Sequence, residues 1–452
     1  MPEVAVRRVA RAALLVFAAA LALGLWSSPR GAEPALACAF LRTPQTYEAD
    51  RSRQAYMDVI DAAAVDALFP GDPFFGLPTV EVGTRSNRSD SAIRQVPVEV
   101  LRAVAWVESG ITMASRSVSF ESSGDTLISF DCGHGVMQVT TGMTLPLGAN
   151  RGPSATQVSV ATHYAYNIAR GAAILVDKWN RAPQSRPIVG TDTGSSPQLI
   201  ENWYYAVWSY NGFSGPGAIR SNHPADPVFG GWPRERYRCD GTQSRNRYPY
   251  QELIWGCMAR PPTPNGVPLW SPVDATLPNL SQVSYFEALS VANFRFPFAR
   301  MDMPTPQPAH QTDPPAVRRG FRSDVLAAPR LSVNEPPIEI RTEGTYEETR
   351  ATVRIANSGT GILSWLATSS AGWIVVDPPA GVALGTDVDC TGRGCSREAE
   401  ITITVNPTLL PGARARGTLR ISTPNGQGRD VEIRIDVDAD FEVGAPGTSR
   451  AY

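Results

Sequence analysis

Glu108 lies at the end of the apolar face of a predicted helix, a position that suits the carboxyl of a general acid. It closes a helix that we predict over 97–108, because Pro97 suits the first turn of a helix and Gly110 suits its end. Apolar neighbours and the partly negative helix terminus both disfavour the charged form, so we expect a raised pKa and a carboxyl that is protonated near neutral pH. Judged by spacing alone, the pattern is explained at least as well by an exposed glutamate at a fraying helix end, with no catalytic role. The apolar residues on the same helix face are Leu101, Val104 and Ala105.

Two later helices would have to complete such a site. The first is predicted over 155–181, with Asn167 at the margin of its apolar stripe and Gly171 where another helix can approach closely. The second is predicted over 198–210 and ends in Tyr210, on the same face as its apolar residues. Taken singly, each of these residues is explained by core packing more often than by ligand binding.

Four short segments, taken together and in order, are more specific than any one of them. They are Trp106-Val107-Glu108-Ser109-Gly110, Gly135-Val136-Met137-Gln138, Asn167-Ile168 with Gly171, and Ser209-Tyr210-Asn211-Gly212. Over residues 91–220 this series resembles the soluble lytic transglycosylases, lysozyme-like enzymes that cleave peptidoglycan. The resemblance implies a lysozyme-like, mainly α-helical domain, peptidoglycan glycan strands as the partner, and no cofactor or metal.

The same resemblance implies how the reaction would run. Glu108 would protonate the glycosidic oxygen between N-acetylmuramic acid and N-acetylglucosamine, then take a proton from the muramoyl 6-hydroxyl as this closes to a 1,6-anhydro ring. One carboxyl serves both steps because the nucleophile belongs to the substrate, in contrast to the paired carboxylates of ordinary glycosidases. Ser109 and Tyr210 would orient Glu108 by hydrogen bonds. The residues that would line the sugar cleft are Met137, Gln138, Asn167 and Asn211.

The spacing between the first two segments departs from the family. Gly135 follows Glu108 by 27 positions, which is longer than usual and makes room for an insert. A carboxyl of this insert that faced Glu108 would hold a water, and the enzyme would then be a hydrolytic, lysozyme-type muramidase. Asp131 and His134 lie nearest the second segment, although capping a loop fixed by Cys132 is the simpler role for them. The acidic residues of the insert are Glu121, Asp125 and Asp131.

Composition excludes several other classes of function. The 452 residues carry 41 Lys and Arg against 43 Asp and Glu, so no broad basic surface is expected to bind nucleic acid. Lys178 is the only lysine, which leaves one candidate for any lysine-dependent chemistry. A non-catalytic cell-wall-binding protein is a third interpretation, but such a protein has no need of the intact Glu108-Ser109 pair. We expect a monomer.

The first residues predict export. Arg7, Arg8 and Arg11 precede an apolar run over 12–26, which is short for a membrane span of about 20 residues and typical of a signal peptide. We therefore place a signal peptide over 1–37 and the protein outside the cell, in the periplasm or at the cell wall. An uncleaved N-terminal anchor and a lipid on Cys38 are the alternatives.

Six cysteines fit an oxidising compartment, in agreement with export. Proximity in the sequence favours pairing Cys390 with Cys395 and Cys239 with Cys257. The two that remain, Cys38 and Cys132, would then pair with each other.

We predict a multidomain α + β chain, and the hydrophobic period and the proline content indicate where its domains begin and end. A period of two in the apolar residues of the last part predicts an Ig-like antiparallel β-sandwich, and six prolines mark the segment before it as a linker. Leu363-Ser364-Trp365, Gly372-Trp373 and Pro378-Pro379 loosely resemble bacterial Ig-like modules of the BACON type. Because a sandwich Trp is usually buried, we favour a spacer or an envelope- or glycan-docking module. The predicted parts are an N-terminal helical extension (38–90), the catalytic domain (91–300), the linker (301–330), the sandwich (331–440) and a flexible tail (441–452).

Overall fold

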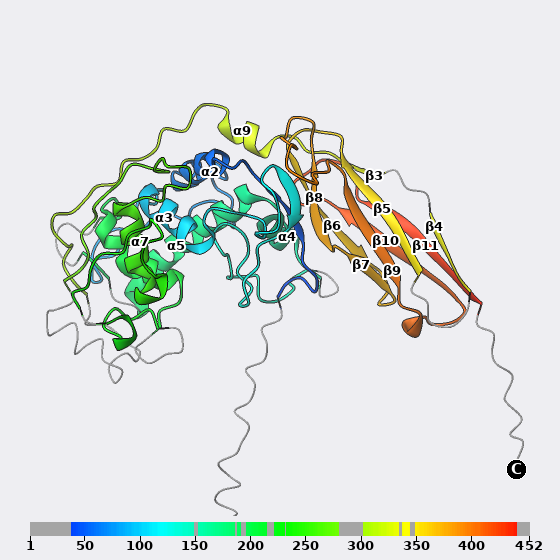
Figure 1. Ribbon diagram of the computed structural model, residues 1–452, viewed down its shortest axis with the longest axis horizontal. Coiled ribbons are helices and arrows are strands. Elements are labelled where there is room, and N and C mark those ends of the chain that lie inside the picture. The colour runs from blue at the N-terminus through cyan, green and yellow to red at the C-terminus, as the bar shows by residue number, and fades with distance from the viewer. Residues whose placement is uncertain are drawn as a thin grey trace, which may run out of the picture. The chain divides into compact units, whose positions relative to one another are not determined.

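The computed structural model describes residues 38–148, 152–185, 188–190, 196–214, 221–230, 232–279, 302–333, 337–343 and 349–440. From Cys38 onward the chain forms one compact unit. The predicted signal peptide and the C-terminal tail lie outside the described residues. The architecture is mixed: helices predominate in the first part, and largely antiparallel sheets follow (Figure 1).

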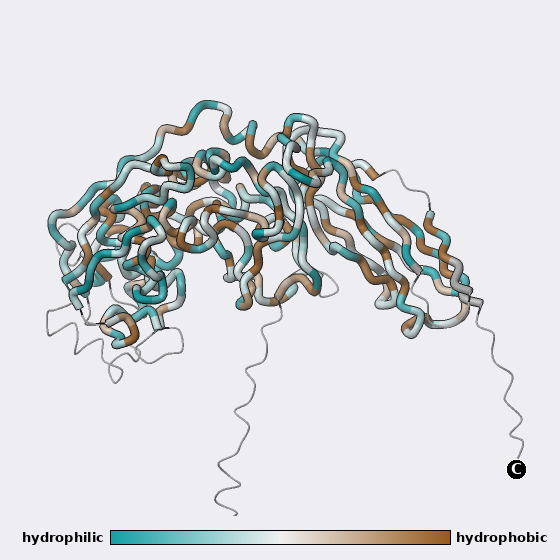
Figure 2. The backbone as a smooth tube through the Cα atoms, in the orientation of Figure 1, coloured by the Kyte–Doolittle hydropathy of each residue, from teal (hydrophilic) through white to brown (hydrophobic). Residues whose placement is uncertain are grey.

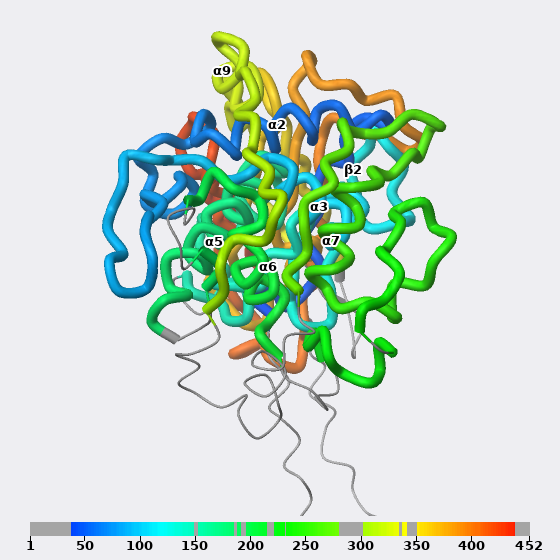
Figure 3. The backbone as a smooth tube through the Cα atoms, turned by 90° about the vertical axis from the view of Figure 1, so that its left-hand side faces the viewer, coloured from blue at the N-terminus to red at the C-terminus, as the bar shows by residue number. Residues whose placement is uncertain are grey.

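The first part also contains a small two-stranded sheet, in which β1 (Gln45–Glu48) pairs antiparallel with β2 (Ser122–Asp125). The helix that carries Glu108 is α3 (Val98–Ser109), which lies against α2 and α7 (Figure 3). The other helical elements are α2 (Gln54–Ala64), α4 (Ala155–Thr162), α5 (Tyr164–Ser185), η2 (Ile200–Trp203), α6 (Tyr204–Tyr210), η3 (Pro227–Phe229), η4 (Arg245–Arg247), α7 (Tyr250–Ala259) and α9 (Phe321–Leu326).

Helix α3 forms where the apolar period predicts it, and its predicted face is buried. Leu101, Val104 and Ala105 are fully inaccessible to solvent, and Gly110 ends the helix in the left-handed conformation (φ 73°). The predicted helix over 155–181 is instead two helices, because His163 takes an extended backbone between α4 and α5.

Residues of the segment over 38–64 form hydrogen bonds to the end of α3 and to the turn after it. Glu48 accepts hydrogen bonds from the backbone N–H groups of Met113 (2.9 Å) and Ala114 (2.7 Å). Arg53 Nε donates to the carbonyl of Gly110 (2.9 Å), one of the carbonyls that a helix end leaves unpaired. The segment over 38–64 therefore fixes the turn that follows Glu108.

Two sheets share a second hydrophobic core. Their strand orders are β4-β11-β10-β6-β8 and β3-β5-β9-β7, and every pair is antiparallel except β11 with β4. The predicted period of two is confirmed, since apolar residues alternate with polar ones along these strands (Figure 2). The strands are β3 (Leu331–Val333), β4 (Ile338–Glu343), β5 (Thr349–Asn357), β6 (Ile362–Ser369), β7 (Ile374–Asp377), β8 (Ala380–Leu384), β9 (Ala399–Val405), β10 (Arg414–Ser422) and β11 (Val431–Asp440), with η5 (Pro407–Leu409) between β9 and β10.

The Pro-rich segment and the sheets are both held to the helices. Thr312 Oγ1 donates to Glu99 Oε2 (2.7 Å), and Met303 is buried. On strand β6, Ser364 is hydrogen-bonded to Thr162 at the end of α4 (2.8 Å). The Trp365 and Trp373 side chains are buried, so neither offers its ring to a sugar.

All three predicted disulfides are present: Cys38–Cys132, Cys239–Cys257 and Cys390–Cys395. The bond of Cys38 uses the sulfur to which a lipid would be attached, so this structure is incompatible with lipidation at that residue. Disulfides persist outside the cytosol, which is consistent with an extracellular or periplasmic location. Among the residues described, no helix has the length and apolarity to span a membrane.

Candidate active site

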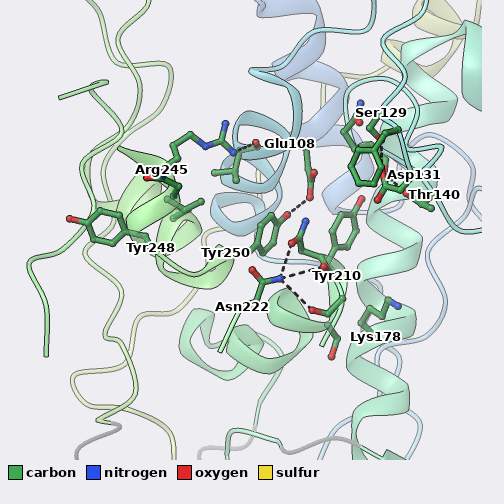
Figure 4. Close-up of a pocket in the computed structure, with 18 residues that line it drawn as sticks. Glu108, Ser129, Asp131, Thr140, Lys178, Tyr210, Asn222, Arg245, Tyr248 and Tyr250 are labelled. Atoms are coloured by element: carbon green, nitrogen blue, oxygen red, sulfur yellow. Dashed lines mark hydrogen bonds between the residues drawn. The ribbon is translucent and has the colours of Figure 1, made fainter. Parts of the chain in front are cut away.

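A cavity of about 660 Å³ opens beside the end of α3 and contains Glu108 (Figure 4). Helices α3, α5, α6 and α7, the insert after α3 and the loop before α7 all contribute to its wall. Most of the lining groups are polar. The lining residues are Val107, Glu108, Ser129, Phe130, Asp131, Gln138, Thr140, Lys178, Ser209, Tyr210, Asn211, Gly212, Asn222, Arg245, Asn246, Tyr248, Tyr250 and Leu253.

The carboxyl of Glu108 has the properties expected of a general acid. Part of the residue's surface opens to the cavity, but the carboxyl is enclosed by protein, and this burial raises its pKa to about 7. A hydrogen bond from Tyr250 and the positive charge of Arg245 offset part of the rise. The negative charge of Asp131 adds to it, and a hydrogen bond from Asn211 reduces it slightly.

Tyr250 holds the carboxyl by a hydrogen bond, and Asn211 lies beside it. The Tyr250 hydroxyl donates to Glu108 Oε1 at 2.5 Å, from the first turn of α7. The Asn211 amide lies close enough to Glu108 to lower its pKa slightly, and Asn222 Nδ2 donates to Asn211 Oδ1 at 2.8 Å. That second bond occupies the amide oxygen of Asn211, which turns its NH₂ group toward the carboxyl. Figure 4 shows Tyr250 and Tyr210 on either side of the Glu108 side chain.

Tyr250 was missed by the sequence analysis. It belongs to a short helix, α7, inside the polar, aromatic stretch between Cys239 and Cys257. The bracketing cysteines were the available clue, because a disulfide across this stretch closes it into a compact unit.

Ser109 and Tyr210 support the site indirectly. Ser109 Oγ donates to the carbonyl of Val136 (2.8 Å), and the Tyr210 hydroxyl donates to the carbonyl of Met137 (2.8 Å). Both were expected to bond to Glu108, but the bonds that they make tie the end of α3 and the end of α6 to the segment over 135–138. They position this segment, which brings Gln138 to the cavity, rather than the acid itself.

Of the four residues expected to bind substrate, Gln138 and Asn211 line the cavity. Gln138 sits in the left-handed region (φ 44°), which is strained for a residue with a side chain, and its amide donates to the Gly135 carbonyl (2.8 Å). Met137 and Asn167 are fully buried behind the wall.

Asn167 has a structural role that explains its buried position. Its amide nitrogen donates to the carbonyls of His134 (2.8 Å) and Val160 (2.9 Å), and its oxygen accepts from the N–H of Met137 (2.9 Å). Nearby, a Cβ atom on Gly171 would stand 2.5 Å from that of Met137, so this glycine does permit a close approach, although by the turn over 135–138 and not by the helix that we expected.

The insert after α3 brings one carboxyl to the cavity. Asp131 lines it and accepts a hydrogen bond from Ser129 Oγ (2.6 Å). Glu121 instead accepts from Thr391 Oγ1, and Asp125 pairs with Gln45 in the β1–β2 ladder. The other residue of interest, His134, is buried, and burial lowers its pKa to about 4.

Two further features shape the cavity. Phe130, a large apolar side chain, lines the cavity and is 72% exposed. Arg245 donates to the carbonyl of Val107 and lies on the opposite side of Glu108 from Lys178 (Figure 4). Within the described ranges, no three His, Cys, Asp or Glu side chains come together as a metal site would require.

Comparisons with known proteins add little. No family model matches the sequence, and no curated protein matches it. Among solved structures, a GH5 xyloglucanase of Bacteroides ovatus is 18% identical over 26% of this chain and 20% of its own (TM-score 0.17). The CupB2 chaperone of Pseudomonas aeruginosa is 11% identical over 25% of this chain and 57% of its own (TM-score 0.19). At these TM-scores the likenesses carry no weight for fold or function.

Proposed function

We propose that this protein is an exported peptidoglycan lytic transglycosylase, with Glu108 as its single acid and base. The observation that carries the proposal is one enclosed carboxyl with a pKa of about 7, facing a polar cavity of about 660 Å³. A pKa near the working pH lets one group be protonated for the first step and deprotonated for the second.

The contacts of Glu108 suit both halves of the reaction. Protonated Glu108 gives its proton to the glycosidic oxygen as that bond breaks. The resulting carboxylate then accepts the proton of the muramoyl 6-hydroxyl, which closes on the anomeric carbon, so the enzyme ends as it began. Tyr250 stabilises the intermediate carboxylate by donating to it and keeps it aimed at the cavity, and the nearby Asn211 amide favours the same charged form.

Hydrolysis is the second candidate, and Asp131 is the observation that favours it. Its carboxyl lines the same cavity and is close enough to raise the pKa of Glu108. A water activated by Asp131 would replace the 6-hydroxyl as nucleophile and give a reducing end. The Ser129 hydroxyl already donates to this carboxyl, which favours the simpler role of holding the loop beside Cys132.

The same proposal assigns the two parts of the chain. The helices around α3 are the lysozyme-like catalytic domain, and the two sheets over one core are an Ig-like module. With both of its core Trp rings buried, that module serves to dock or space the enzyme at the envelope.

A digestion of purified peptidoglycan tests the enzymatic claim. The protein should release soluble muropeptides, and Glu108→Gln should lower the rate by at least about a hundredfold. Glu235→Gln, which makes the same change at an exposed position, is the matched control and should keep full activity. Release of product by Glu108→Gln at the rate of the unaltered protein would refute the assignment.

A further inference from the structure

One loop of the sandwich is built against the helical part of the protein. We call residues 388–395, between β8 and β9, the disulfide loop, because the bond between Cys390 and Cys395 closes it. The side chains of Val388, Cys390 and Cys395 pack against the hydrophobic core of the helices and not against that of the sandwich. A disulfide across so few residues adds little to global stability, so its main effect is on the local shape of this loop.

The disulfide loop contacts the start of the insert that follows α3. The Gly392 N–H donates to the carbonyl of Glu121 (3.0 Å), and Thr391 Oγ1 donates to the Glu121 carboxylate. The two backbones lie so close that a Cβ atom on Gly392 would overlap the backbone oxygen of Phe120. Glycine is therefore required at this position by the contact with the insert.

The same loop supports the strand that pairs with the insert. Tyr47 lies in β1, and its hydroxyl donates to the carbonyl of Asp389 (2.6 Å). The Thr46 hydroxyl donates to the carbonyl of Thr162 (2.6 Å), and the Thr162 hydroxyl is hydrogen-bonded to Ser364 of β6. Two paired strands alone are only marginally stable in water, so the β1–β2 ladder gains from this support by the sandwich.

The other end of the insert reaches the cavity. Asp131 follows β2 by a few residues and lines the wall, on the opposite side of Glu108 from Arg245 (Figure 4). Between β2 and Asp131, the Thr126 N–H donates to the Pro44 carbonyl (2.9 Å), which fixes the path of the chain toward the cavity. The insert thus contacts the sandwich at one end and forms part of the cavity wall at the other.

We infer that the disulfide loop of the sandwich positions the insert, and with it Asp131, in the cavity wall beside Glu108. The sandwich then contributes to the active site in addition to docking or spacing the enzyme. The inference rests on the proposed function only because it takes the cavity to be the active site, and the support of the insert is measurable without substrate.

Hydrogen exchange in the full chain tests this support. Gly392→Ala should displace the insert, so the amides of 122–133 should exchange at least about tenfold faster. Gly392 lies outside the left-handed region, so the alanine is not strained by its own backbone. Tyr47→Phe removes only the hydrogen bond to the loop and should speed the same amides about two- to tenfold. Gly412→Ala, at an exposed glycine of the sandwich where a Cβ atom has nothing within 4 Å, is the matched control and should leave them unchanged.

The pH dependence of activity separates positioning from a general loss of stability. The titratable and charged groups that face Glu108 are Tyr210, Arg245, Tyr250 and Asp131. Asp131 is the carboxylate among them, and its charge raises the Glu108 pKa. Withdrawal of Asp131 should therefore lower that pKa and move the alkaline limb of kcat/KM to lower pH, whereas a variant that merely unfolds more easily keeps the limb in place.

The two measurements distinguish the inference from the function on which it rests. Unchanged exchange over 122–133 in Gly392→Ala and Tyr47→Phe would overturn the inference, as would an alkaline limb that stays in place in both variants. Faster exchange in these variants of a protein that cleaves no peptidoglycan would overturn the proposed function and leave the support of the insert intact.

Discussion

The Tyr250 hydroxyl donates to Glu108 Oε1 at 2.5 Å, although the two residues are 142 positions apart. The contact joins the last turn of α3 to the first turn of α7, and the Cys239–Cys257 disulfide anchors the segment that supplies the tyrosine. Everything proposed for the acid depends on this pairing, because it both aims the carboxyl and moderates its pKa.

Removal of that hydroxyl should slow the reaction and shift its pH dependence. Tyr250→Phe should lower kcat by about ten- to a hundredfold, the range expected for loss of a hydrogen bond to a charged group. The hydroxyl stabilises the carboxylate, so its loss should raise the Glu108 pKa and move the alkaline limb of the profile upward. Tyr248→Phe, another hydroxyl removed from the cavity wall, is the matched control. An unshifted limb in Tyr250→Phe would show that the contact has no part in tuning the acid.

If Glu108 is the acid that we propose, the unaltered protein should lose activity as the pH rises. Glu108 must carry a proton for the first step, and burial raises its pKa to about 7. Values of kcat/KM should therefore fall about tenfold per pH unit above pH 7, as measured by release of soluble product. A flat profile up to pH 9 would mean that another group supplies the proton.

The buried carboxyl should also cost stability in alkaline solution. Its pKa is about 7 in the folded state and 4.5 ordinarily, so the folded state holds the extra proton between these values. The free energy of unfolding then falls as pH rises through this window, and above it the loss stays constant. Glu108→Gln does not titrate, so its stability relative to the unaltered protein should increase from pH 4.5 to pH 8. Urea unfolding at both pH values measures this, and an unchanged difference would contradict the account.

The disulfide at Cys38 should stabilise the protein more than the one at Cys390. Cys38–Cys132 spans 94 positions and Cys390–Cys395 spans 5. The chain-entropy model then gives about 4.7 kcal/mol for the first and about 2 kcal/mol for the second. Paired Cys→Ser variants, unfolded in urea, compare the two losses. A larger loss from the short loop would indicate that strain or residual structure dominates.

Local patterns in the sequence predicted much of the scaffold. The apolar period of α3 placed Glu108 at its end, and alternation predicted the strands of the last part, because each pattern depends on neighbours within a few residues. Proximity also selected two of the disulfides correctly, and the remaining two cysteines form the third.

The features that the sequence did not reveal depend on contacts between distant segments. β1 has only four residues and is stabilised by β2, from the insert after α3. The partners of Ser109 and Tyr210 are backbone carbonyls of another segment, and a sequence carries no pattern for such a bond. The same limit hid Tyr250, whose role depends on where α7 packs.

The origin of the oxygen at the new sugar end tests the central claim most directly. Peptidoglycan should be digested in water enriched in ¹⁸O, and the muropeptides weighed. Closure by the muramoyl 6-hydroxyl predicts 1,6-anhydro ends, one water lighter than reducing ends and free of ¹⁸O. Reducing ends that carry ¹⁸O from the time of cleavage, and that disappear in Asp131→Asn, would contradict the transglycosylase assignment and identify a hydrolase.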